Sequence, residues 1–217
     1  MKQLIAVCAV LVTLTTSAAA KLLVAVVEDV QGKVTGAEFM DYVAPAAVIE
    51  IGDGGSIVLS YMTSCRREKI SGIGTVIVGT QASVVHLAEV KSEKTDCDSR
   101  QAYMTTRETS EVAATVLRSI ALPKPQLTLY GASPLVEAKG GGTLVLQRLD
   151  VAGEREQVDL DGTQLKGKFF DFASADRALA PGGLYAATFK SSKVIFQVDP
   201  QAKPGATSIV GRLLRME

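Results

Sequence analysis

The chain has 217 residues, in which 23 lysines and arginines balance 23 aspartates and glutamates, and it has no tryptophan. The composition therefore lacks both the basic excess that neutralises phosphates and the indole rings that stack on bases, which argues against nucleic-acid binding. A chain of this length forms one large domain or two small ones.

The N-terminus has the three parts of a secretory signal peptide. Lys2 supplies the positive start, residues 4–16 form an uncharged run, and Ala18–Ala20 provides a small-residue cleavage site. The run is too short for a comfortable membrane span, and no later apolar stretch approaches that length. We therefore expect a signal peptide over residues 1–20, cleavage near Ala20 and a periplasmic or secreted protein without a stable membrane span. An uncleaved anchor is the less favoured alternative.

Removal of the signal would leave two cysteines, Cys65 and Cys97. In an oxidising compartment an even pair favours a disulfide over free thiols, and closing the loop between them would contribute about 3 to 4 kcal/mol. The alternative is a reactive thiol, because Arg66, Arg67 and Lys69 would activate a free Cys65. A zinc site is disfavoured, since it needs three or four ligands and the chain has a single histidine.

Strand signals dominate residues 21–104. Apolar and other residues alternate over Ile49–Ile51 and Ile57–Tyr61, on either side of Asp53-Gly54-Gly55, which predicts a β-hairpin. A second strand pair is predicted around Gly79–Ala82. Short strands at such close spacing favour a sandwich, a barrel or a small solenoid.

The pattern then becomes helical. Val112, Val116 and Ile120 recur at the spacing of one helix face, and Pro123 ends any helix that precedes it. We predict a connector helix and proline linker over residues 105–124, which would separate two modules.

Strand signals return over residues 125–217. The segments QLTLY, TLVLQRL and GGLYAATFKSSKVIFQVDP read as strands, the last as two strands joined near Lys190. Several short strands in such a length fit an immunoglobulin-like (Ig-like) sandwich, although the cysteine and tryptophan signature of true immunoglobulin domains is missing. We expect Phe169, Phe170 and Phe172 to pack in the core or between the modules.

The N-terminal half resembles the FecR-like β-domain of bacterial envelope proteins. The resemblance rests on the strand ending at Gly32, the segment IEIGDGGSIVLSY, Cys65, ISGIGTVIVG and the second cysteine. The C-terminal half, with LAPGGLYAATF before VIFQVDPQAKPG, resembles the Ig-like modules that follow such domains. FecR itself is a transmembrane regulator that binds a sigma factor inside the cell and a receptor outside. Because we expect no cytoplasmic segment here, the resemblance implies only a periplasmic protein-binding surface.

Two sets of residues invite a catalytic interpretation. His86 has Ser83 as its nearest serine, but residues three apart on a strand point to opposite faces, and no nucleophile-elbow motif is present. Asp171 and Asp176 would supply paired carboxylates. Aspartates around a short polar turn more often act as caps, so we favour structural roles for both sets.

We therefore expect a mainly β, non-catalytic periplasmic protein that binds a protein or another cell-envelope component as an adaptor or sensor, without a cofactor or metal. The alternatives are an envelope enzyme acting on glycan or peptide, with its site around His86 or Asp171, and a purely structural envelope component. The residues predicted to contact a partner lie in two expected turns: Asp53, Gly54, Gly55, Arg66, Arg67 and Lys69.

Overall fold

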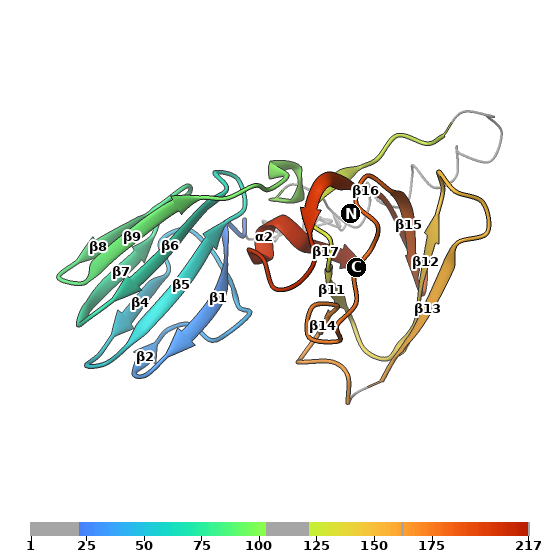
Figure 1. Cartoon of the computed structure of the whole chain (residues 1–217). Coiled ribbons are helices and arrows are strands. Elements are labelled where there is room, and N and C mark those ends of the chain that lie inside the picture. The colour runs from blue at the N-terminus through green and yellow to red at the C-terminus, as the bar shows by residue number, and fades with distance from the viewer. Residues whose placement is uncertain (1–21, 103–121, 162, 217) are drawn as a thin grey trace, which may run out of the picture.

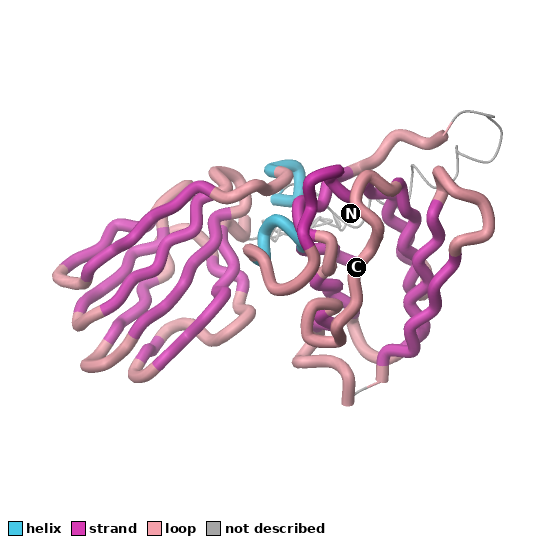
Figure 2. Tube along the Cα trace, in the orientation of Figure 1, coloured by secondary structure: helices cyan, strands magenta, loops and turns pink. Residues whose placement is uncertain are grey.

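A computed structural model of the protein describes residues 22–102, 122–161 and 163–216, and strands dominate these ranges (Figures 1 and 2). The predicted mainly β class is confirmed. The predicted signal peptide and connector helix lie outside the described residues, so both stay predictions. Within the described ranges, no helix combines the length and apolar character needed to cross a membrane.

The first module consists of two sheets that face each other. The five-stranded sheet has the order β3-β1-β5-β6-β9, and the four-stranded sheet has the order β2-β4-β7-β8. Alternate residues of both sheets point inward and form one apolar core that includes Ile49, Leu59, Ile70 and Val76. The strands are β1 (Ala25–Gln31), β2 (Val34–Thr35), β3 (Tyr42–Val43), β4 (Val48–Ile51), β5 (Ser56–Tyr61), β6 (Arg66–Ser71), β7 (Gly74–Val78), β8 (Ser83–His86) and β9 (Glu89–Lys94).

The predicted hairpin on either side of Asp53-Gly54-Gly55 is wrong, because its two strands belong to different sheets. β4 pairs with β2 and β7, whereas β5 pairs with β1 and β6. The turn is real, and Gly54 has a φ of 67°, but it carries the chain from one sheet to the other. The second predicted pair is confirmed, since β7 and β8 form an antiparallel hairpin across Gly79–Ala82.

The second module follows a short 3₁₀ helix, η1 (Ser99–Ala102), and the linker. Its sheets have the orders β10-β16-β15-β12-β13 and β14-β11-β17, and the predicted pairing of β15 with β16 is confirmed. The elements are β10 (Leu127–Gly131), β11 (Leu135–Ala138), β12 (Gly142–Arg148), β13 (Arg155–Leu160), β14 (Phe169–Asp171), β15 (Leu184–Phe189), β16 (Ser192–Lys203), α2 (Ile209–Arg212) and β17 (Leu213–Met216).

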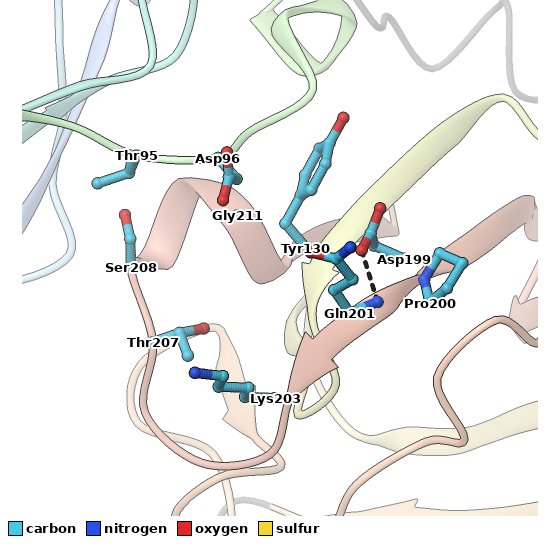
Figure 3. Close-up of a pocket in the computed structure, with 10 residues that line it drawn as sticks. All are labelled: Thr95, Asp96, Tyr130, Asp199, Pro200, Gln201, Lys203, Thr207, Ser208 and Gly211. Carbon is cyan, nitrogen blue, oxygen red and sulfur yellow. Dashed lines mark hydrogen bonds between the residues drawn. The ribbon is translucent and has the colours of Figure 1, made fainter.

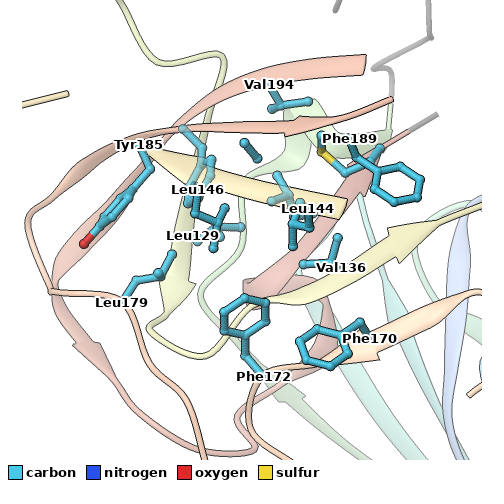
Figure 4. Close-up of a cluster of buried hydrophobic side chains, with 14 of the residues drawn as sticks. Leu129, Val136, Leu144, Leu146, Phe170, Phe172, Leu179, Tyr185, Phe189 and Val194 are labelled. Atoms are coloured by element: carbon cyan, nitrogen blue, oxygen red, sulfur yellow. The ribbon is translucent and has the colours of Figure 1, made fainter. Parts of the chain in front are cut away.

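Aromatic and aliphatic side chains fill the space between these two sheets (Figure 4). Phe170 and Phe172 meet edge to face with ring centroids 5.2 Å apart. Phe169, on the opposite face of β14, instead joins an apolar cluster at the junction of the modules. The expectation that these rings pack in the core or between the modules is therefore confirmed.

The junction cluster draws buried side chains from both modules. α2 lies at the junction in Figure 1 and packs against β1 and β5 of the first module. The cluster contains Val26, Met40, Met62, Leu135, Phe169, Ile209, Val210 and Leu213. Burial of these side chains joins the two modules through an apolar interface.

Candidate functional site

A carboxylate of the first module holds the start of α2 in the second. Glu28 lies at a register shift in β1, where a bulge aims its side chain at the junction. Its Oε1 atom accepts hydrogen bonds from the Ser208 hydroxyl at 3.1 Å and the Ile209 amide at 2.6 Å. Its Oε2 atom accepts one from Arg67 Nε at 2.6 Å. The carboxylate thus satisfies a free amide at the N-terminal end of α2 and pairs with the half-buried Arg67 guanidinium.

A second buried carboxylate, Glu137 on β11, lies at the same junction. It accepts hydrogen bonds from the Tyr42 hydroxyl at 2.5 Å, Lys168 Nζ at 2.5 Å and Arg215 Nε at 3.2 Å. Lys168 and Arg215 also lie within 4.5 Å and 5.3 Å of the Tyr42 ring centroid. Burial raises the pKa of Glu137, but the bonds from Lys168 and Tyr42 outweigh it and hold the pKa below its ordinary value. The group is therefore an ionised structural link at neutral pH.

A cleft of about 810 Å³ opens along this junction (Figure 3). One wall comes from the segment after β9, a second from β10 and β16, and the third from the loop before α2 and from α2 itself. We call this the junction cleft. It is lined by Thr95, Asp96, Tyr130, Asp199, Pro200, Gln201, Lys203, Thr207, Ser208 and Gly211.

The walls of the junction cleft are fixed by covalent and polar contacts. The predicted disulfide between Cys65 and Cys97 is confirmed, and it anchors the cleft-lining segment to the start of β6. One residue further on, the Asp98 carboxylate accepts a hydrogen bond from the Thr128 amide at 2.9 Å, which ties the same segment to β10. On the α2 side, a Cβ atom at Gly211 would lie 2.7 Å from the Asp96 carbonyl oxygen, so only glycine allows this approach.

Three polar side chains in the cleft remain available to a ligand. Within the described part of the chain, Asp96, Tyr130 and Lys203 make no side-chain hydrogen bond or ion pair. Figure 3 shows the Tyr130 ring standing between Asp96 and Asp199, with Lys203 nearer Thr207. The cleft thus presents carboxylate acceptors, an ammonium donor and an aromatic face. Such convergent polar groups in a concave site are typical of ligand binding.

The lining of the junction cleft offers hydroxyls and carboxylates but no imidazole or thiol, because it contains no histidine and no cysteine. Among the described residues, no group of three or more histidine, cysteine, aspartate or glutamate side chains is arranged to hold a metal ion.

The predicted partner-binding residues do not come together. β5 begins opposite Gln31 and ends opposite Ala25, at the junction end of β1, so the turn Asp53-Gly54-Gly55 lies at the far end of the first module. Gly54 is exposed there and has open space around it. This turn therefore remains a separate surface from the junction cleft.

The prediction that Arg66, Arg67 and Lys69 form a turn is wrong, because all three lie on β6. Glu68 and Ile70 point inward and are buried, whereas Arg67 and Lys69 point to the opposite face. Arg66 starts the strand on the face of Glu68, and its Nη1 atom lies 3.7 Å from the Glu68 carboxylate. Arg67 forms ion pairs with Glu28 and Glu93, and its Nη1 atom lies 2.8 Å from the Glu93 carboxylate. Arg66 and Lys69 are exposed. The disulfide also leaves no free thiol at Cys65 for these charges to activate.

The two sets of residues considered for catalysis lie in different modules. His86 is exposed on β8, and the Ser83 hydroxyl is engaged with the Tyr61 hydroxyl at 2.7 Å. Asp171 lies on β14, where Arg212 Nη1 approaches its carboxylate to 2.5 Å. Burial raises the pKa of Asp171, but the bond from Arg212 holds it below its ordinary value. A carboxyl that stays ionised in this way is a poor general acid at neutral pH.

Sequence reasoning missed the residues that build the junction. Glu28 and its partner Ile209 are 181 positions apart, and Glu137 and Arg215 are 78 apart. Glu28 and Glu137 are single acidic residues within strands, and neither belongs to a recognisable sequence motif. The one available signal was Gly211, which stands beside apolar residues. A glycine in such a place can indicate that two backbones approach closely.

Comparison with known proteins adds no family to this description. No family model matches the chain, and no curated protein or solved structure gives a match. The assignment of a function therefore rests on the residues and geometry given above.

Proposed function

We propose that this protein is a non-catalytic binding protein of the bacterial cell envelope and that the junction cleft holds its ligand. The single observation that carries the proposal is the convergence of three uncommitted polar side chains, Asp96, Tyr130 and Lys203, on a cleft whose walls are fixed. A preformed site costs its ligand little ordering entropy, so such an arrangement suits binding.

Several features support a location in the cell envelope and a non-catalytic role. The N-terminal sequence has the pattern of a signal peptide, and the disulfide between Cys65 and Cys97 is suited to an oxidising compartment. The resemblance to FecR-like and Ig-like envelope modules points the same way. Glu28, Glu137 and Asp171 are each committed to basic partners rather than left to transfer protons.

The ligand is expected to be a polar envelope component, either a protein segment or another molecule rich in hydrogen-bonding groups. The cleft carries two carboxylates and one ammonium group, so it does not favour polyanions. Its tyrosine offers a ring face for an aliphatic stem or for the apolar side of a ligand.

Site-specific photocrosslinking in intact cells tests the proposal. A photoreactive phenylalanine derivative replaces Tyr130 in the cleft, and the matched control carries it at Val151, an exposed residue between β12 and β13. We expect one dominant crosslinked species from position 130 that is absent from position 151. Asp96→Ala and Lys203→Ala should each weaken it.

Two results would contradict the proposal. Identical crosslinks from both positions, or none from position 130, would remove the junction cleft as the binding site. Incubation of the purified protein with the captured component, followed by mass spectrometry, separates binding from catalysis. An unchanged ligand mass agrees with binding, whereas a product would establish the enzyme alternative.

A further inference from the structure

The sheet edge formed by β8 in the first module lacks the charged side chains that β9 carries at the edge of the facing sheet. Exposed edges invite pairing with another chain and are usually shielded by charges. β9 carries Glu89, Lys91, Glu93 and Lys94, and all six of its residues are exposed. By contrast, residues 79–88, which include β8, contain no aspartate, glutamate, lysine or arginine.

An apolar row crosses the outer face of the same sheet and ends at this edge. Val48 on β4 lies opposite Ile77 on β7, and Ile77 lies opposite Val84 on β8. Residues directly opposite each other share a face, and the neighbours Ile49 and Val76 are fully buried on the core side. Val48 and Val84 are therefore on the outside, where they are 52% and 54% exposed.

We propose that β8 pairs antiparallel with β8 of a second copy of this chain, about a two-fold axis that passes beside Val84. In this register Val84 lies opposite Val84 of the second copy. The rows of the two copies then join into one continuous row, Val48–Ile77–Val84 followed by the same residues in reverse order. A two-fold interface requires a self-complementary surface, and an apolar row that ends at the edge meets this condition.

The charged side chains of β9 make it a less favourable edge than β8 for pairing with a second copy. Any pairing of β9 with itself would take lysine and glutamate side chains out of water, and a pairing about Lys91 would also place Lys91 against Lys91 and Glu89 against Glu93. Like charges directly opposite each other destabilise a strand pair. β8 imposes no such repulsion, because its side chains are a serine, two valines and a histidine. The edge that lacks charge is therefore the one that a second copy can approach.

The ladder that forms is short. The Ser83 amide already donates to the Glu68 carboxylate at 3.0 Å, so it is not free for the second copy. The apolar row must supply much of the association. We therefore expect a dimer whose population rises with protein concentration, formed independently of the junction cleft.

Position-specific crosslinking of the full chain tests the register. In the dimer, Val84→Cys places two thiols across the axis at a spacing that a disulfide can bridge. Ser92→Cys puts the thiol on the charged edge β9 and serves as the control. We expect Val84→Cys to form crosslinked dimers on mild oxidation at least about ten times faster than Ser92→Cys, a margin that corresponds to roughly 1.4 kcal/mol.

Analytical ultracentrifugation of wild type and Val84→Lys completes the test. We expect wild type to dimerise over a concentration series and Val84→Lys to remain monomeric with an unchanged melting temperature, because Val84 is half-exposed. A wild-type protein that stays monomeric throughout would overturn the proposal. So would equal crosslinking of the two cysteine variants, or a complex between β8 and a different protein without any dimer. None of these results bears on ligand binding in the junction cleft.

Discussion

Removal of the disulfide should destabilise the protein by an amount that follows from the size of its loop. Cys65 and Cys97 are separated by 32 positions, and their bond removes loop freedom from the unfolded chain. For a loop of this size the chain-entropy relation gives about 12 cal/mol/K, which is about 4 kcal/mol near room temperature. The double variant Cys65→Ser/Cys97→Ser should lose this free energy of unfolding.

Urea and thermal unfolding of the double variant measure the effect. A loss of about 4 kcal/mol should lower the melting temperature by roughly 8 to 16 °C for a chain of this size. Reduction of the wild-type protein with dithiothreitol is the matched control, because it opens the same loop without changing a residue. Both should give the same shift.

Particular results would refute this reasoning. A loss below about 1 kcal/mol in both samples would mean that the loop is already ordered in the unfolded chain. Two titratable thiols in the native wild type would mean that the bond is absent. If the variant loses stability but reduced wild type does not, the serines themselves disturb the packing.

Two further predictions concern the junction. The pKa of Glu137 is lower in the folded state than in the unfolded state, so its contribution to stability is present above about pH 4.3 and is lost as pH falls through the folded value. Urea unfolding at pH 7 and pH 3 should therefore show a larger acid loss for wild type than for Glu137→Gln, and equal losses would contradict this role. Gly211→Ala should cost about 1 to 3 kcal/mol, because the new Cβ would meet the Asp96 carbonyl oxygen at 2.7 Å. Gly141→Ala, whose Cβ has its nearest neighbour at 3.2 Å, is the control, and equal melting temperatures for the two variants would refute the close approach.

The strands could be predicted because their signal is local. Alternating apolar residues located β4, β5, β7 and β8, and the short connection at Gly79–Ala82 identified a true hairpin. The same alternation does not state which strand is the partner. For this reason the turn at Asp53 was mistaken for a hairpin, although it carries the chain between sheets.

The candidate site could not be predicted, because it is assembled from distant segments. Asp96 comes from the first module, whereas Tyr130 and Lys203 come from two strands of the second, so no local sequence pattern links the three residues. The disulfide is the exception. The expected compartment, together with the two cysteines left after the expected signal cleavage, was sufficient to predict it.

The contacts at the junction explain why two β modules would act as a single binding unit. Modules joined by a linker usually move relative to each other unless their interface is large and apolar. Here an apolar cluster is reinforced by Glu28, which reaches α2, and by Glu137, which meets Tyr42 across the junction. Opening the junction would strip these carboxylates of the hydrogen bonds from Ser208, Ile209 and Tyr42, and a buried charged group left without a donor is costly, so both carboxylates oppose partial opening. The junction cleft should therefore keep its shape before a ligand arrives.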